Sequence, residues 1–309
     1  MATIATPLLE AVSLSHSYAS GSAWWKRAES HRVLRNVSLS IYPARTLGIV
    51  GESGSGKTTL CRLLLKLEQP TSGNVLFRGH GLQQLSSPQQ RGFHCDVQAV
   101  FQDPFSSLNP RMTAAAILEE PFRAEGLYRN RTERRSQVES LMRLVGLDTS
   151  LLGRYPAQFS GGQRQRIAIA RALALQPQLI IADEPVTALD VSVQAQIMNL
   201  LRELQEQRGV SYVFVSHNLN MVRFLCHDIV VMQAGRIVER GPTSSVFERP
   251  QHPYTRALFA ATPTPDPDAV RPAPEALQVA SIPSDDAQEI EVFEDHWILM
   301  PNAGTRNVV

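Results

Sequence analysis

A chain of 309 residues, 43% of them hydrophobic, is long enough for one large globular domain with an appendage and too apolar for global disorder. Its net charge of +1 gives no electrostatic reason to expect nucleic acid as a partner. The cysteines Cys61, Cys95 and Cys226 form no CxxC pair, which argues against disulfides or a thiolate metal site and favours a reducing compartment. Neither a signal peptide nor a membrane span of roughly 18 apolar residues is expected, so other chains would have to cross a membrane.

The first 70 residues predict strands followed by a helix. Alternating apolar residues in Leu8–Leu14 and Leu34–Ile41 indicate strands of a partly solvated sheet. Between them, Gly21–Arg27 combines two tryptophans with two basic residues. Nucleic-acid stacking is one interpretation, but a long hairpin loop is favoured because the net charge is near zero. The apolar strand Thr46–Val50 then leads through a Gly/Ser turn into a helix expected over Lys57–Leu67.

The rest of the core alternates between helix and strand. Residues 111–176 are mostly helical in pattern. The continuous apolar runs Leu179–Ala182 and Tyr212–Val215 are typical of parallel strands covered on both faces. Asp228–Met232 and Arg236–Val238 are expected to be the last strands of the sheet. The predicted fold class is therefore α/β, a nucleotide-binding core on a parallel sheet with a helical insertion and a β-rich edge.

The composition changes from about Thr262 onward. Five prolines between Pro263 and Pro274 indicate a linker. Alternation in Glu289–Met300 predicts a short strand that docks on a partner, with a frayed terminus as the other interpretation. We expect a nucleotide-binding domain over 1–262, with a helical subdomain over about 103–176, and a linker and tail over 263–309.

The run Gly51–Thr58 matches GxxxxGK[ST] in full, between a predicted strand and a predicted helix. Glycines let backbone N–H groups surround a phosphate, and the helix N-terminus adds positive potential. Lys57 can then reach the β- and γ-phosphates while the Thr58 hydroxyl ligates Mg²⁺. The expected nucleotide contacts are Ser53, Gly54, Ser55, Gly56, Lys57, Thr58 and Thr59.

Two adjacent carboxylates follow the buried strand Leu179–Ala182. Asp183 would lie at the carboxyl edge of the sheet, where it can hold Mg²⁺ through water. Glu184 is then placed to accept a proton from an attacking water molecule. A strand followed by two acidic residues is a weak signal alone and a strong one behind a complete phosphate loop.

A second glycine motif, Ser160-Gly161-Gly162-Gln163, shortly precedes these carboxylates. Ser160 is a good N-cap, and the glycines leave a helix N-terminus that an anion can approach. An ordinary capped helix would show the same pattern. The run nevertheless resembles the signature of the ABC ATPase family, and the resemblance covers about residues 8–262 with the family's motifs in order.

The resemblance implies further roles. Tyr18 would stack on adenine, and Gln102 would ligate Mg²⁺ and link the site to a membrane partner. Asp190 would communicate across a dimer, and His217 would contact the γ-phosphate. In this family the signature of one subunit closes over the ATP held by the other, so a single copy cannot complete a site. The signature residues that would serve the neighbour's nucleotide are Ser160, Gly161, Gly162 and Gln163.

Three stretches narrow the resemblance to the dipeptide, oligopeptide and nickel importers: Phe101–Arg111, Ala182–Gln196 and His252–Leu258. Membership would imply the second ATPase of a heterodimer, with two permeases and a solute-binding protein, peripheral on the cytoplasmic face of the inner membrane. Many members carry a late cysteine segment thought to hold an iron–sulfur cluster. No cysteine follows Cys226, so no cluster is expected here.

Two other functions compete with a transport ATPase. A soluble ABC ATPase could serve a non-transport machine, such as a phosphonate-cleaving or DNA-associated complex. Near-neutral charge and the lack of zinc-type cysteines count against DNA repair, and the importer-like stretches count against the others. A regulatory pseudo-ATPase is disfavoured because Lys57, Asp183, Glu184 and His217 are all present.

Overall fold

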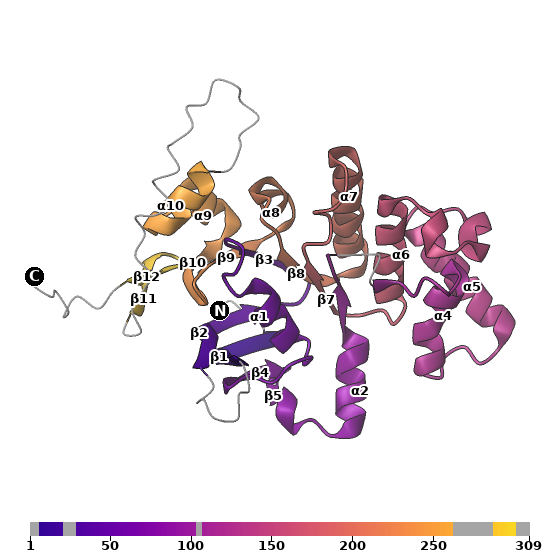
Figure 1. Ribbon diagram of the computed structural model, residues 1–309, viewed down its shortest axis with the longest axis horizontal. Coiled ribbons are helices and arrows are strands. Elements are labelled where there is room, and N and C mark those ends of the chain that lie inside the picture. The colour runs from indigo at the N-terminus through magenta and orange to yellow at the C-terminus, as the bar shows by residue number, and fades with distance from the viewer. Residues whose placement is uncertain (1–5, 21–28, 103–106, 262–286, 301–309) are drawn as a thin grey trace, which may run out of the picture. The chain divides into compact units, whose positions relative to one another are not determined.

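The computed structural model describes residues 6–20, 29–102, 107–261 and 287–300 (Figure 1). The chain forms two compact units. The first comprises residues 1–84 together with 214–309, and the second comprises residues 85–213. The predicted loop over 21–27, the proline-rich stretch over 263–274 and residues 103–106 lie outside the described residues.

An antiparallel sheet in the first unit contains β1 (Leu9–Ser20), β2 (Glu29–Ile41), β4 (Ser72–Phe77) and β5 (His80–Gly81), in the order β2-β1-β4-β5. Leu9 pairs with Ile41, and both side chains are fully buried. The alternation that predicted the two long strands is confirmed. Both run further than expected, to Ser20 and from Glu29.

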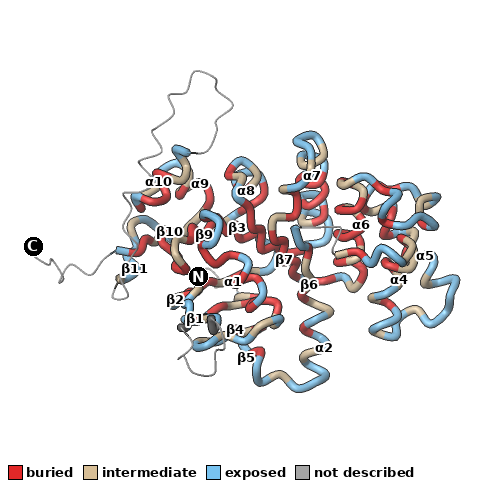
Figure 2. The backbone as a smooth tube through the Cα atoms, viewed as in Figure 1, coloured by how far each residue is buried: buried red, intermediate tan, exposed pale blue. Residues whose placement is uncertain are grey.

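A second sheet of this unit carries the phosphate loop. Within this unit the sheet contains β3 (Thr46–Val50), β9 (Asp228–Gln233), β10 (Arg236–Pro242), β11 (Gln288–Phe293) and β12 (His296–Met300), which follow one another in the order β11-β12-β10-β9-β3. β3 and β9 are parallel, and the other neighbours are antiparallel. Figure 2 shows the buried central strands of this sheet. The unit's helices are α1 (Lys57–Leu64), α8 (Leu219–Leu225), α9 (Thr243–Glu248) and α10 (Pro253–Ala260).

Three sequence predictions for this unit are wrong in detail. The helix expected to reach Leu67 ends at Leu64, because Lys66 takes a left-handed conformation (φ 57°) that stops the helix. β9 and β10 are not the last strands of the sheet, since the tail adds β12 and β11 beside β10. The single strand predicted over Glu289–Met300 is a hairpin that turns at Asp295 (φ 57°) and docks on its own chain.

The hairpin is held to β10 by side chains as well as by the strand ladder. Arg240 on β10 donates to Glu289 on β11 at 2.9 Å. The same guanidinium lies over the Trp297 ring of β12, 5.3 Å from its centre. Ile298 and Leu299 of β12 are buried. These contacts explain why an acidic tail segment is ordered against the core.

The second unit is richer in helices. It contains α2 (Ser87–Asp96), β6 (Val97–Val100), α4 (Ala114–Ala124), α5 (Arg131–Leu144), α6 (Gly161–Leu173), β7 (Leu179–Asp183) and α7 (Val191–Arg208). β8 (Ser211–Val215) follows α7, and β6 pairs with β7 in parallel. The helical prediction for residues 111–176 is confirmed by α4, α5 and α6, whose apolar faces are buried together. None of the helices in the described ranges has the length and apolarity needed to cross a bilayer.

Two histidines of the first unit, the buried His252 and the more exposed His227, predict an acid-sensitive fold. His227 Nδ1 accepts the Thr46 backbone N–H at 3.1 Å, and His252 Nδ1 accepts that of Tyr254 at 3.2 Å. Burial lowers the pKa of both below the ordinary 6.5; Arg45 adds to this at His227 and Arg256 at His252, whereas Asp228 and Glu239 oppose it. The unfolded chain therefore binds more protons below about pH 6.5, and stability present above that pH is lost as the pH falls.

The expected result is a thermal unfolding midpoint that drops between pH 7.5 and pH 5.5. His252→Asn keeps an acceptor for the helix cap but cannot titrate, so its midpoint should depend less on pH. The midpoints are measured by circular dichroism for both chains across this range. An equally steep drop in His252→Asn and in His227→Asn would contradict the assignment.

Candidate functional site

The phosphate loop lies between β3 and α1, where the sequence placed it. Gly51, Gly54 and Gly56 have φ of 150°, 81° and 102°, a region that favours glycine. A Cβ on Gly51 would lie 2.2 Å from the Met232 carbonyl oxygen, so the loop has no room for a side chain there. The Gly235 N–H, in the turn after β9, donates to the Ser55 carbonyl at 3.1 Å. The end of β9 thus supports the loop from behind.

The hydrogen-bond donors of the loop are suited to binding an anion. Gly56 caps α1 without a side-chain hydrogen bond, so no cap side chain covers the first N–H groups of the helix. The buried Lys57 donates to the carbonyls of Gly51 at 2.8 Å and Glu52 at 2.7 Å, which holds its ammonium against the loop. The Ser55 hydroxyl is buried and has no hydrogen-bond partner in the described part of the chain. These donors fit the oxygens of a nucleotide phosphate chain.

Tyr18, near the end of β1, lies close to the helix that follows the loop. Its hydroxyl donates to Glu68 at 2.6 Å and is 3.4 Å from the Thr59 hydroxyl. The ring packs edge-on against His16 and is 37% exposed. An aromatic ring is thus fixed beside α1 and open to solvent, as a base-stacking role requires.

His217 comes to the same edge of the sheet as the phosphate loop. It follows β8, and the preceding Ser216 N–H donates to Ile49 of β3 at 3.3 Å. Ile49 is two residues before Gly51. The exposed His217 therefore lies near the start of the loop although 166 positions separate them in the sequence (217 minus 51).

The paired carboxylates lie in the second unit at the end of β7. Asp183 is the last residue of the strand and is buried, as predicted. Glu184 adopts a left-handed conformation (φ 48°), which is strained for a residue with a side chain. The Thr187 hydroxyl donates to Glu184 Oε2 at 3.0 Å. The backbone turn and Thr187 together fix where the Glu184 carboxylate points, a role for Thr187 that no sequence pattern indicates.

The Ser-Gly-Gly-Gln run begins α6. Ser160 is the N-cap, as predicted: its hydroxyl accepts the Gln163 N–H at 3.3 Å, and the Gln163 side chain accepts the Ser160 N–H at 3.0 Å. Ser160 is exposed, whereas Gly162 is buried. The start of α6 is therefore a capped helix N-terminus that opens to solvent on the serine side.

Gly162 also has a packing role that the sequence did not reveal. A Cβ there would lie 2.3 Å from Val193 Cγ1 on α7. We expect Gly162→Ala to destabilise the second unit by about 1–2 kcal/mol. The steric overlap with Val193 destabilises the fold by more than the higher helix propensity of alanine stabilises it. The matched control is Gly161→Ala, whose Cβ would meet only the end of Leu189 at 3.2 Å.

Urea unfolding of the full chain measures this effect. Adding Val193→Ala removes the clashing methyl group, so the double variant should regain the stability that Gly162→Ala loses. If Gly162→Ala is as stable as Gly161→Ala, the close approach of α6 and α7 does not constrain this position.

Gln102 and Asp190 are both exposed in the second unit. Gln102 follows β6, and Asp190 is the residue before α7. The expected donors to Mg²⁺ (Thr58, Gln102 and Asp183) are a hydroxyl, an amide and a carboxylate, the hard oxygen ligands that this ion prefers. Within the described ranges, no group of three or more His, Cys, Asp or Glu side chains is arranged to hold a metal by itself.

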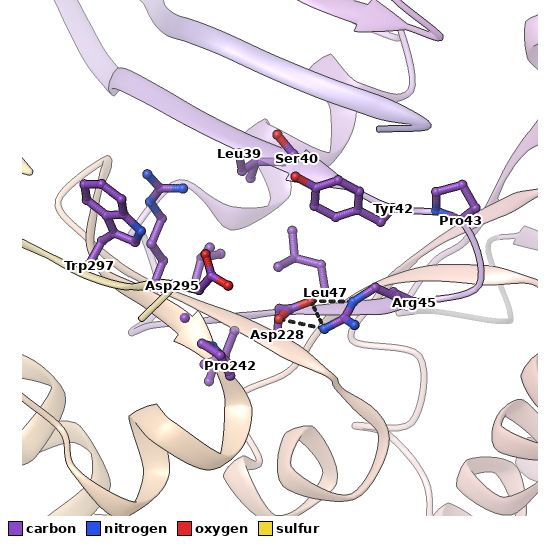
Figure 3. Close-up of a pocket in the computed structure, with 14 residues that line it drawn as sticks. Leu39, Ser40, Tyr42, Pro43, Arg45, Leu47, Asp228, Pro242, Asp295 and Trp297 are labelled. Carbon is purple, nitrogen blue, oxygen red and sulfur yellow. Dashed lines mark hydrogen bonds and ion pairs between the residues drawn. The ribbon is translucent and has the colours of Figure 1, made fainter. Parts of the chain in front are cut away.

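A cavity of about 440 Å³ lies elsewhere in the first unit (Figure 3). Its walls include Tyr42 and Leu47 on one side and Asp295 and Trp297 of the hairpin on the other. Arg45 in its wall is paired with Asp228 at 2.8 Å. None of the predicted nucleotide-site residues lines this cavity.

Comparisons with known proteins agree with this geometry. Residues 34–187 match the model of the ABC transporter family, and residues 238–284 match the C-terminal region of the oligopeptide/dipeptide transporter family. The ATP-binding cassette MJ0796, solved as a dimer in a post-hydrolysis state bound to ADP and Pi, aligns with a TM-score of 0.66 and 31% identity, over 76% of this chain and 98% of its own. The fold is thus that of an ABC ATPase, and the chain is an ATPase that couples ATP hydrolysis to transport.

Other relatives are more similar in sequence. The chain is 48% identical to a probable peptide ABC transporter ATP-binding protein of Sinorhizobium fredii, over 85% of this chain and 75% of the relative. It is 46% identical to the dipeptide transport ATP-binding protein DppF of Haemophilus influenzae, over 86% and 81%. The chain belongs to the ATP-binding proteins of ABC transporters, in the oligopeptide/dipeptide transporter family.

Proposed function

We propose that this chain powers the import of dipeptides or oligopeptides by binding and hydrolysing ATP beneath a membrane permease. The observation that carries the substrate class is the match of residues 238–284 to the oligopeptide/dipeptide transporter C-terminal region, in the same chain as a complete phosphate loop. Three relatives named for peptide, dipeptide and di/tripeptide transport support it. The domain organisation we propose is an ATPase domain over 1–262, with a helical subdomain over about 103–176, and a linker and tail over 263–309.

Each half of the site has a proposed role. Lys57 and the loop N–H groups bind the phosphates and stabilise the charge that develops on them, and Ser53–Thr59 make the nucleotide contacts. Thr58, Gln102 and Asp183 hold Mg²⁺, which would neutralise the phosphate oxygens. Tyr18 stacks on the base. Glu184 accepts the proton of the attacking water, and its strained backbone and the Thr187 hydrogen bond pre-orient it for that task.

The remaining residues act across a dimer. Ser160, Gly161, Gly162 and Gln163 begin a helix that would face the neighbour's ATP, and the capped but solvent-open N-terminus of α6 suits an anion. Asp190, exposed before α7, would communicate across the same interface. His217 contacts the γ-phosphate. ATP closes the two subunits on each other and hydrolysis releases them, which is the mechanical output.

The proposed assembly has four kinds of chain. A second, homologous ABC ATPase pairs with this one, two permeases cross the inner membrane, and a solute-binding protein delivers the peptide. This chain would lie on the cytoplasmic face. The test is to tag the chain, extract native membranes gently and identify what co-purifies. Recovery with two permeases and a second ATPase supports the proposal, whereas recovery only in membrane-free complexes would favour a non-transport ABC ATPase.

A further inference from the structure

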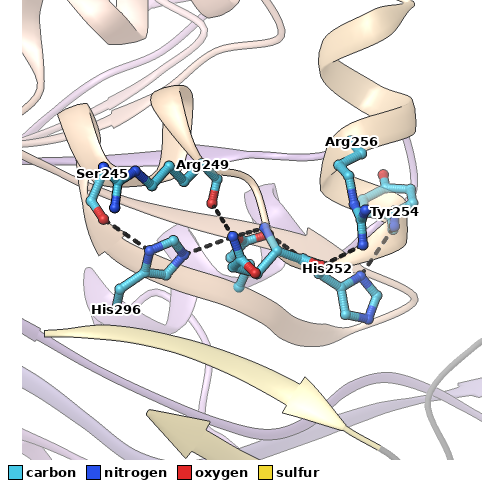
Figure 4. Close-up of polar contacts among 8 residues, drawn as sticks. Ser245, Arg249, His252, Tyr254, Arg256 and His296 are labelled. Atoms are coloured by element: carbon cyan, nitrogen blue, oxygen red, sulfur yellow. Dashed lines mark hydrogen bonds and ion pairs between the residues drawn. The ribbon is translucent and has the colours of Figure 1, made fainter. Parts of the chain in front are cut away.

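A chain of hydrogen bonds in the first unit joins the C-terminal hairpin to the phosphate loop. It starts on β12 and ends at Glu52, the second residue of the loop. All of its members belong to one compact unit, and most are buried. Figure 4 shows its central part, from Ser245 and His296 to His252 and Tyr254.

The centre of this chain is the Glu239 carboxylate on β10. Glu239 and His296 are both fully buried, and His296 Nε2 lies 2.7 Å from Glu239 Oε1. His296 Nδ1 contacts the Ser245 hydroxyl at 2.9 Å. The carboxylate also accepts the backbone N–H groups of Gln251 at 2.7 Å and His252 at 2.9 Å. A buried carboxylate that accepts three hydrogen bonds is held in one position, because moving it would leave buried polar groups unpaired.

Glu239 in turn fixes the start of α10. His252 is the N-cap of this helix, and its Nδ1 accepts the Tyr254 N–H. Because the backbone N–H of His252 is held by Glu239, the first turn of α10 cannot shift without breaking a bond to a buried charge. The backbone of Tyr254 is therefore fixed by hydrogen bonding. Its ring is fixed by burial, because the residue is only 1% exposed.

The hydroxyl of Tyr254 reaches the phosphate loop. It accepts the Glu52 N–H at 3.1 Å, across 202 positions of sequence. The Glu52 carbonyl meanwhile accepts the Lys57 ammonium at 2.7 Å. Glu52 is thus bonded through its N–H to Tyr254 and through its carbonyl to Lys57, the residue that we propose to bind phosphate.

We propose that Tyr254 is a positioning residue of the phosphate loop, and that the C-terminal hairpin steadies it through His296 and Glu239. Loop geometry at Glu52 then depends on a segment beyond residue 284, where the match to the family's C-terminal region ends. The inference rests on the proposed role of the loop in binding ATP. It gives the tail a function, which is to hold the nucleotide site in shape.

The test compares nucleotide binding by single hydroxyl deletions. Tyr254→Phe keeps the ring and removes only the acceptor of the Glu52 N–H. Its matched control is Tyr212→Phe on β8, because the Tyr212 hydroxyl is equally buried but has no hydrogen-bond partner within the described residues. The full-length chain is titrated with a fluorescent ATP analogue, and its thermal unfolding midpoint is recorded in parallel.

Tyr254→Phe should bind the analogue about three- to ten-fold more weakly, the effect of one lost hydrogen bond, while Tyr212→Phe binds as the parent chain does. His296→Ala should weaken binding in the same direction. If the hairpin acts through Tyr254, the double variant Tyr254→Phe/His296→Ala should bind no more weakly than Tyr254→Phe alone.

The outcomes separate the two proposals. Unchanged affinity in a folded Tyr254→Phe chain would overturn the positioning role while leaving ATP binding intact. Fully additive losses in the double variant would show that the hairpin does not act through Tyr254. A parent chain that fails to bind the analogue would overturn the proposed nucleotide site together with this inference.

Discussion

Replacing Glu184 by glutamine is expected to stop ATP turnover at this chain's site while ATP stays bound. Glutamine preserves the shape of the side chain and can still contact Thr187, but it cannot take a proton from water. Loss of a general base typically lowers the rate by about 10²–10⁴-fold. The measurement is phosphate release by the assembled complex, together with the amount of nucleotide that remains bound after rapid gel filtration.

Glu206→Gln on α7 is the matched control for this change. Glu206 is exposed and pairs only with Arg202 of the same helix in the described structure, so its neutralisation should leave hydrolysis unchanged. Undiminished phosphate release by Glu184→Gln within an assembled complex would contradict the general-base role. Loss of both hydrolysis and bound ATP would instead indicate that Glu184 helps to bind the nucleotide.

Lys57→Ala is expected to weaken ATP binding as well as hydrolysis. The Lys57 ammonium is buried against the loop and is bonded to two of its carbonyls, so its removal takes away both a phosphate ligand and a support of the loop. Hydrogen bonds to a charged group are worth roughly 1.5–3 kcal/mol, which corresponds to about 10–100-fold in affinity. A further loss of about 10²–10³-fold in turnover is expected from the missing transition-state charge.

The matched control is Lys66→Asn just after the same helix. Lys66 has φ 57°, a conformation that asparagine tolerates, so this variant loses the same charge without backbone strain. Binding of a fluorescent ATP analogue and phosphate release are measured for both variants. Equal behaviour of Lys57→Ala and Lys66→Asn would exclude a direct contact between Lys57 and phosphate.

Several features of this protein could be predicted from its sequence because they depend on neighbouring residues. A phosphate loop needs closely spaced glycines and a helix N-terminus, and both are encoded within Gly51–Thr58. Ser160 was predicted as an N-cap and Asp183 as the end of a buried strand, because caps and strand ends depend on neighbouring residues. The family resemblance followed from these contiguous motifs, and the matches to relatives confirm it.

Features that depend on distant contacts could not be predicted in this way. Alternation in the tail indicated a strand, but not that a turn at Asp295 would fold it into a hairpin against β10. Two glycines in the signature suggested an open helix N-terminus, whereas only the position of Val193 on α7 shows that Gly162 has no room for a methyl group. Neither contact leaves a periodic or spaced signal in the sequence.

The sequence by itself therefore determined the class of fold and the family, and it predicted which residues bind and hydrolyse ATP, because each motif is a contiguous run of residues. Only the tertiary structure decided what holds those groups in place. Tyr254 and Glu52 are 202 positions apart and meet because α10, which packs on β10, and the phosphate loop belong to the same unit. Contacts of this kind follow from how whole elements pack, and packing depends on the entire chain.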